Sequence, residues 1–317
     1  MDVDNSRFGT VAAARADASA RRGARAQARR GAARERAARL VLGAAAMVSG
    51  LAVCAIFGFL VYFCLPLLQD GQLAQVFSWR WRPFQGGFGI LPMVVGSLTL
   101  AVAALVAAYP VAIGVCCFAH GLGPARAGRA VLGVVRFMTS IPTVIYGFVS
   151  VFLLVPLIRG GFSGSGFCWL AALCGLSVLI LPTLVLIVHA QFELTEPRVL
   201  LTSAALGLTP GQRLVRLTLP LSWRGLAAAA VLGFGRAVGD TIVPLMLAGN
   251  AAQTPGSPLD SVRTLTSHIA LVVATDSHSA AYNSLFACGV ILFGVTVAVN
   301  LSLQWLRRCA ARSGNHG

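Results

Sequence analysis

Lysine is absent from the sequence, and charged residues of either sign are scarce. All 25 basic residues are Arg, and with the ten acidic residues they make up only 11% of the 317 residues. Soluble domains carry about a quarter charged residues, so this chain has too little polar surface to face water on all sides. It also lacks the Lys that a P-loop places against nucleotide phosphates. We therefore expect a membrane-embedded chain that is not itself a P-loop ATPase.

Metal-binding and disulfide patterns are missing as well. The eight Cys lie mostly in apolar runs without a CxxC pair, and the five His form no HExxH motif. Zinc sites need ligands at such short spacings, and a disulfide framework needs polar loops. We expect no catalytic residues, no metal and no cofactor.

The N-terminal segment, residues 1–39, is polar and rich in Arg. It holds ten Arg, four acidic residues and a single aromatic residue, Phe8. Nucleic-acid binding would call for stacking aromatics between the basic residues, so this reading is disfavoured. A signal peptide is excluded because no small-residue cleavage site closes the apolar run that follows. The segment is predicted to be a disordered cytoplasmic tail that fixes membrane topology.

Six apolar segments follow the tail, and each is close to or above the roughly 20 residues that a helix needs to cross a bilayer. Their length and lack of alternation exclude membrane strands. We therefore predict an all-α membrane protein with six transmembrane helices, placed at Leu40–Leu68, Met93–Ala119, Val131–Ile158, Phe167–Ala190, Gly225–Ala248 and Tyr282–Leu306.

Arg residues between the spans are distributed very unevenly. Taking the N-terminus as cytoplasmic, the inner segments hold ten, two, four and three Arg, 19 in all, whereas the outer segments hold four. The positive-inside rule then places both termini in the cytoplasm, including a C-terminal tail at 307–317. It also makes 191–224 a cytoplasmic loop and 249–281 an outer loop. Within the outer loop, His268–Ala274 is predicted to be a short helix at or dipping into the membrane face.

The cytoplasmic loop has helical character with a break at Gly207–Gly211. Small residues precede Gly207, and Thr209-Pro210-Gly211 favours a turn followed by a new helix. We predict two short helices that dock in a partner's groove, although an ordinary surface loop is an alternative. A bulky side chain at Gly207 is expected to obstruct the break. The segments in question are Leu201-Thr202-Ser203-Ala204-Ala205-Leu206-Gly207 and, nine residues later, Leu217-Thr218-Leu219-Pro220.

The fifth apolar segment carries two charged residues, Arg236 and Asp240, followed by Thr241. Charges inside a span cost about 2.5–3.5 kcal/mol each, so these side chains are expected to pair across one helical turn. Gly235 and Gly239 form a small-xxx-small step that favours close helix packing. Two roles stay open, namely an ion pair that holds the bundle together and a polar point on an anion path.

Several other polar or helix-breaking residues lie near the ends of spans. Pro142 and Pro182 are expected to bend spans three and four. Arg136 is expected to snorkel to lipid headgroups. His189 and Glu193 are spaced for a surface pair on one helix face.

The cytoplasmic loop resembles the coupling loop of type I ABC importer permeases, whose pattern is E-A-A-x3-G-x9-I-x-L-P. Gly207, Leu219 and Pro220 match it, and Leu217 replaces the Ile conservatively. The E-A-A triplet falls on Leu201-Thr202-Ser203, so its acidic residue is absent. The resemblance implies that the loop docks on a separate ATP-binding subunit dimer.

Further motifs are similar to phosphate ABC transporter permeases of the C-type. They are Phe77-Ser78-Trp79, Phe88-Gly89-Ile90-Leu91-Pro92, Ser140 to Phe148 (SIPTVIYGF), and Gly235 to Thr241 (GRAVGDT) with Ala248-Gly249-Asn250. Asp240 stands where that family usually has Glu. The resemblance implies a permease domain over 92–306, a bacterial inner-membrane location, a second and paralogous permease subunit, and an extracytoplasmic phosphate-binding protein.

Other functions remain open at this point. Sulfate, molybdate or phosphonate could replace phosphate, because the selecting protein would be a different chain. A secondary transporter that uses Arg236 and Asp240 as a charge relay is a rival class. Inverted repeats in the sequence would favour it, but the spans show no convincing repeat. A purely structural anchor would leave the loop at 191–224 without a role.

Overall fold

The computed structural model describes residues 35, 38–65, 76–82, 87–273 and 280–313. The chain divides into two compact units, 1–59 and 60–317. The described part of the first unit belongs almost entirely to an apolar helix, Ala38–Leu65, which continues into the second unit. Most of the Arg-rich segment 1–39, the segment 274–279 of the predicted outer loop, and residues 314–317 lie outside the described residues.

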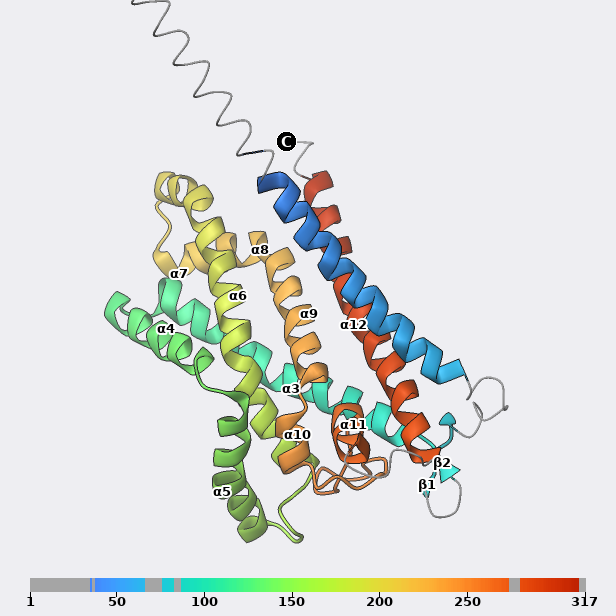
Figure 1. Ribbon diagram of the computed structural model, residues 1–317. Helices are drawn as coiled ribbons and strands as arrows, with labels where there is room; N and C mark the ends of the chain where they lie inside the picture. Colours follow the sequence, from blue (N-terminus) through green and yellow to red (C-terminus); the bar gives the residue numbers. More distant parts are fainter. Residues whose placement is uncertain (1–34, 36–37, 66–75, 83–86, 274–279, 314–317) are drawn as a thin grey trace, which may run out of the picture. The chain divides into compact units, whose positions relative to one another are not determined.

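The second unit is a bundle of helices, preceded by a two-stranded antiparallel hairpin that pairs Trp81 with Phe88. Figure 1 shows the longest helices α3, α6 and α12 and the shorter ones between them. The elements are β1 (Trp81–Arg82), β2 (Gly87–Phe88), α3 (Leu91–Cys117), π-helix η2 (Phe118–Leu122), α4 (Ala125–Thr139), α5 (Thr143–Gly161), α6 (Trp169–Ala205), α7 (Pro210–Arg213), π-helix η3 (Leu214–Thr218), α8 (Leu219–Leu221), α9 (Trp223–Gly239), α10 (Ile242–Leu247), α11 (Leu265–Val273) and α12 (Ala280–Ser313).

Within the described residues, five helices are long and apolar enough to cross a membrane. They are Ala38–Leu65, Leu91–Leu122, Thr143–Gly161, Trp169–Pro197 and Leu285–Trp305. A sixth span results if Pro210–Leu221 and Trp223–Gly239, which meet at a 68° bend, are counted as one. The predicted all-α membrane fold is confirmed, whereas the predicted side of the membrane for each terminus stays a prediction.

Two predicted spans are interrupted in the structure. The segment Val131–Ile158 is not one helix, because α4 ends at Thr139 and α5 begins after Pro142, which is its N-cap. Proline disfavours helical backbone in the residue before it, which is Ile141 here. The segment Gly225–Ala248 breaks between α9 and α10, at Asp240 and Thr241. Both corrections concern single sharp breaks inside otherwise apolar runs.

Two other helices run past their predicted ends. Helix α6 continues for 37 residues to Ala205, through Pro182 and Pro197, so the first half of the predicted loop 191–224 is an extension of the fourth span. The prediction of two separate short helices there is therefore wrong for the first of them. Helix α12 continues to Ser313, seven residues beyond the predicted end of the last span at Leu306.

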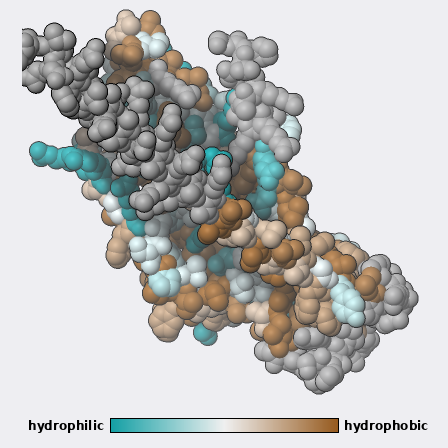
Figure 2. All heavy atoms as spheres, turned by 45° about the horizontal axis from the view of Figure 1, so that its top comes forward, coloured by the Kyte–Doolittle hydropathy of each residue, from teal (hydrophilic) through white to brown (hydrophobic). Residues whose placement is uncertain are grey.

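The core of the bundle lies where α3, α6 and α9 pack together. The face of α3 toward the core carries small residues at helical spacing, namely Ala101, Ala104, Ala108 and Ala112. Small side chains let two helix backbones approach closely, which is the usual way membrane helices associate. On the outside, apolar side chains such as Phe152 and Leu157 of α5 are exposed, and apolar residues are prominent on the face seen in Figure 2.

The short helix predicted at His268–Ala274 exists as α11, which starts three residues earlier and is too short to span a membrane. Its residues Leu265 to His268 are buried, and α11 packs against α3, α10 and α12. The Leu265 N–H donates to the Ser97 hydroxyl on α3 at 2.7 Å. This segment is therefore an integral part of the bundle.

Candidate functional site

The first candidate region is the break between α9 and α10. Asp240 has extended backbone (φ −74°, ψ 132°), which ends α9, and its Oδ2 accepts a hydrogen bond from the Val243 N–H at 3.0 Å. The carboxylate thereby accepts a hydrogen bond from one of the N–H groups at the start of α10 that have no partner within the helix. The Asp240 carbonyl accepts a hydrogen bond from Thr266 Oγ1 of α11 at 2.9 Å. The break is held from both sides, and Thr241 lies within it.

The predicted ion pair between Arg236 and Asp240 is not formed. Within the described residues, no hydrogen bond or ion pair joins the two side chains, because α9 ends at Gly239 and the helical i, i+4 spacing does not extend to Asp240. The two charges interact electrostatically without direct contact. The Arg236 side chain is exposed and borders a pocket of about 200 Å³ between α9 and α12, together with Thr296 and Asn300.

The two glycines of the small-xxx-small step have different surroundings. A Cβ at Gly235 would lie 3.0 Å from Val299 Cγ1 of α12, whereas a Cβ at Gly239 would meet nothing within 4 Å among the described atoms. The close approach within this chain is therefore made at Gly235. Gly239 does not face another helix of the described chain.

Helix α10 is seated on glycine positions of its neighbours. A Cβ at Gly147 of α5 would lie 2.7 Å from the Met246 sulfur, and one at Gly175 of α6 would lie 2.6 Å from Leu247. These contacts explain why the motif at 140–148 contains a glycine in the middle of an apolar helix. They fix the short α10 against α5 and α6.

The second candidate region is the turn that connects α6 to α7. Gly207 follows α6 with φ +63°, a backbone conformation that disfavours side chains. Thr209 then caps α7: its Oγ1 accepts from the Gln212 N–H at 3.3 Å, and its own N–H donates to Gln212 Oε1 at 3.0 Å. This capping box, with Pro210 at the first helical position, confirms the predicted turn and helix start.

The remaining predicted residues of the coupling segment differ in exposure. Leu201 is 80% exposed and Thr202 is exposed, whereas Ser203 is buried and donates to the Leu200 carbonyl at 2.8 Å. Leu217 and Leu219 are half-buried, and Pro220 is exposed. A Cβ at Gly207 would meet nothing within 4 Å among the described atoms, so left-handed backbone is the constraint that the structure shows there. The expectation that a bulky side chain obstructs the break stays a prediction.

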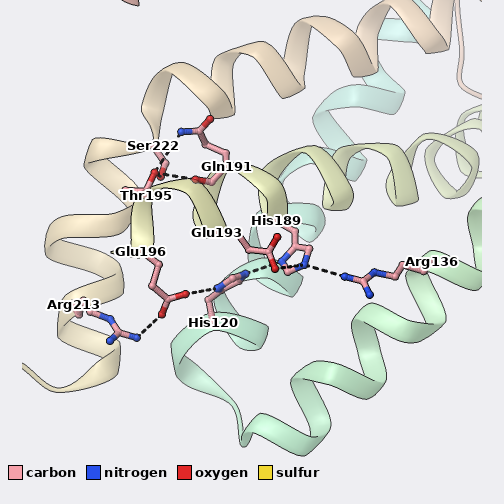
Figure 3. Close-up of polar contacts among 9 residues, drawn as sticks. All are labelled: His120, Arg136, His189, Gln191, Glu193, Thr195, Glu196, Arg213 and Ser222. Atoms are coloured by element: carbon pink, nitrogen blue, oxygen red, sulfur yellow. Dashed lines mark hydrogen bonds and ion pairs between the residues drawn. The ribbon is translucent and has the colours of Figure 1, made fainter. Parts of the chain in front are cut away.

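Near this turn lies a row of ionisable side chains that the sequence did not predict. Arg213 of α7 donates to Glu196 of α6 at 2.8 Å, and the other carboxylate oxygen of Glu196 lies 3.3 Å from His120 Nδ1. His120 Nε2 lies 2.8 Å from His189 Nδ1, and His189 Nε2 lies 3.4 Å from Arg136 of α4. Figure 3 shows these side chains pointing toward one another from four elements. We refer to Arg136, His189, His120, Glu196 and Arg213 as the histidine chain.

Two predictions are corrected by the histidine chain. Arg136 reaches the ring of His189, so it does not simply snorkel toward headgroups. His189 is 7% exposed and bonds to His120, so the proposed surface pair with Glu193 describes only one of its contacts. Sequence spacing could not reveal the histidine chain because His120 and His189 are 69 residues apart.

The described chain is thus a bundle of apolar helices with one span broken beside an exposed Arg and a capped turn at the end of a long helix. Solved structures support this fold. The methionine ABC transporter MetNI, in an inward-facing conformation, matches with a TM-score of 0.52 and 18% identity over 72% of this chain and 99% of that chain. An amino acid ABC transporter solved with histidines matches with a TM-score of 0.53 and 12% identity over 69% and 92%.

The sequence relationship is more specific. Residues 112–312 match the family of binding-protein-dependent transport system inner membrane components, and the chain belongs to this family. It is 32% identical to the probable ABC transporter permease protein YqgH of Bacillus subtilis, over 72% of this chain and 75% of that protein. It is 30% identical to the phosphate transport system permease protein PstC 2 of Mycobacterium tuberculosis, over 85% and 90%. With PstC of Pasteurella multocida it shares 28% over 75% and 81%. The chain is a permease subunit of a type I ABC importer.

Proposed function

We propose that this chain is the permease subunit of an ATP-driven importer for inorganic phosphate and forms half of the translocation path. The observation that carries this proposal is the similarity to several proteins named as phosphate permeases, which extends over as much as 85% of the chain. The exposed guanidinium of Arg236 beside a broken span agrees with an oxyanion substrate, because its planar fork suits two oxygens of one anion.

In this proposal the path residues are Arg236, Asp240 and Thr241. Arg236 offers a positive charge to the passing anion, while Asp240 holds the break open by capping α10 and keeps the site from binding the anion too tightly. An anion held strongly inside the membrane would not leave, so selective recognition belongs to a separate extracytoplasmic phosphate-binding protein. Transport proceeds by alternating access as the helices shift.

The turn between α6 and α7 is proposed as the contact with an ATP-binding subunit dimer, and a second, paralogous permease subunit completes the path. In type I importers the acidic residue of the triplet stands where Leu201 lies, and Leu201 is among the most exposed apolar side chains here. We therefore propose that this chain docks through apolar contact at that position. This assignment places the turn and both termini in the cytoplasm.

Uptake by the complete reconstituted complex tests the proposal. Proteoliposomes containing this chain with its permease partner, ATPase and binding protein should accumulate radiolabelled phosphate only when ATP is present on the ATPase side. Arg236→Ala should abolish uptake while the complex still assembles, and Arg236→Lys should restore only part of it. Uptake without ATP would contradict the importer and favour the secondary transporter. ATP-driven uptake of radiolabelled sulfate, molybdate or phosphonate, without any of phosphate, would contradict the substrate.

A further inference from the structure

The histidine chain joins the proposed ATPase contact to helix α4. It begins at Arg213 on α7, crosses Glu196 and His189 of α6 and His120 of η2, and ends at Arg136 on α4. The two His side chains are largely buried, at 11% and 9% exposure, so water competes little for their hydrogen bonds. Figure 3 shows the histidine chain as one continuous row of side chains.

The end groups determine where the hydrogens lie. The Glu196 carboxylate can only accept, so His120 Nδ1 carries a hydrogen and, in a neutral ring, Nε2 accepts. His189 Nδ1 must then donate to His120, at 2.8 Å, and His189 Nε2 is left as an acceptor. Arg136 can only donate, so it completes the row. With both rings neutral and protonated at Nδ1, every member has a complementary partner.

A second group, the Glu193 carboxylate, lies beside the same atom of His189. Glu193 Oε1 lies 3.4 Å from His189 Nε2, the same distance as the Arg136 nitrogen. In the neutral state Nε2 and the Glu193 carboxylate are two acceptors facing each other, which gives no bond. When Nε2 is protonated, the ring can donate a hydrogen bond to Glu193. The same N–H then faces the Arg136 guanidinium, which is also a donor, so the bond to Arg136 is lost. Protonation thus exchanges a partner on α4 for a partner on α6 itself.

We propose that His120 and His189 are positioning residues that tie α4 to the coupling turn, and that protonation of His189 releases α4 and weakens coupling. This inference rests on the proposed function, because it assumes that α7 contacts an ATPase. The groups that face His189 are Glu193 on its own helix, His120 on η2 and Arg136 on α4. The thiol of Cys116, on α3, donates to the Val185 carbonyl one turn away on α6. No catalytic step is involved, and the proton is taken from and returned to water.

The first test is the number of phosphate ions transported per ATP hydrolysed by the reconstituted complex. The pH is varied between about 8 and about 5, the range that brackets an unperturbed histidine, and we expect this ratio to fall over that range by at least about fivefold, the lower end of typical coupling between sites. His189→Gln should keep the ratio high and flat, because the amide accepts from Arg136 and donates to His120 without titrating. The matched control is Arg129→Gln on α4. Arg129 bonds to the Ala125 carbonyl of its own helix, so this variant should show the same acid-dependent fall as the wild type.

The second test does not require transport. In the purified full-length protein with isotope-labelled histidine, NMR at about pH 8 should show two neutral rings protonated at Nδ1, lost one at a time in His120→Gln and His189→Gln. Protonation at Nε2 in the ring assigned to either His120 or His189 would overturn the inference. A wild-type complex that transports phosphate with a ratio independent of pH would overturn it as well, while leaving the proposed function intact. Absence of phosphate uptake with the expected tautomers present would contradict the proposed function alone.

Discussion

The turn at Gly207 offers a sharp test, because backbone conformation and side-chain size can be separated there. Gly207 has φ +63° and open space around its missing Cβ. Any L-residue must therefore adopt left-handed backbone here, while its Cβ meets no described atom. The cost is roughly 1–2 kcal/mol for an ordinary residue, and less for Asn, which tolerates this region. A change of this size lowers the equilibrium ratio of native to non-native turn about 5- to 30-fold.

Three substitutions of Gly207 should therefore rank by backbone preference. Gly207→Asn should retain most phosphate uptake and most of the ATPase subunit that co-purifies in mild detergent, Gly207→Ala should lose part of both, and Gly207→Val should lose most. Gly133→Val is the matched control. Gly133 lies in the helical backbone of α4 and also has no atom within 4 Å of a Cβ, so the same increase in size should leave coupling intact.

The ranking also states what would refute this reasoning. Equal losses in the Asn and Val variants would mean that a partner occupies the space beside Gly207, so that side-chain volume and not φ is decisive. Normal coupling in the Val variant would mean that the turn is not the ATPase contact at all.

Three further predictions concern other parts of the chain. Asp240→Asn should keep the α10 cap and change stability by less than about 0.5 kcal/mol, whereas Asp240→Ala should cost about 1 kcal/mol in thermal unfolding in detergent; equal effects would contradict the capping role. Burial, and secondarily the charge of Arg263, lowers the pKa of His268 from 6.5 to about 3, so the unfolded chain binds an extra proton below pH 6.5 and stability falls as the pH falls from there toward 3. The loss should be about 2 kcal/mol at pH 5 and should vanish in His268→Phe; an unchanged acid slope in that variant would disprove it. A reporter fused after Arg308 should be cytoplasmic and one inserted near Thr254 external, and finding both on one side would refute the topology.

Several features of this protein followed from local sequence properties. Long apolar runs with few charges require helices in a membrane, because the backbone has no other way to satisfy its hydrogen bonds there. The turn at Gly207 and the helix start at Thr209-Pro210 were predicted because glycine conformation and capping depend on neighbouring residues only. The family resemblance rested on the same turn and on the motifs around Gly147 and Arg236, and the family match confirmed it.

Contacts between distant segments decided the rest. Pro197 costs about 3 kcal/mol inside a helix, yet α6 continues through it. Just before the proline, Ser222 bonds to Thr195 and Arg213 to Glu196. Asp240 caps α10 and does not pair with Arg236, because the helix ends where packing against α11 and α5 places the break.

The histidine chain is the clearest case of a feature that only the tertiary structure could reveal. His120 and His189 show no helical or strand periodicity in common, and they meet because α3 packs along α6. The sequence by itself determined that the helices lie in a membrane and where the turn at Gly207 falls, because both depend on residues close together in the chain. Which polar groups find each other was decided by packing, because a buried hydrogen bond is worth making wherever the fold brings a donor to an acceptor.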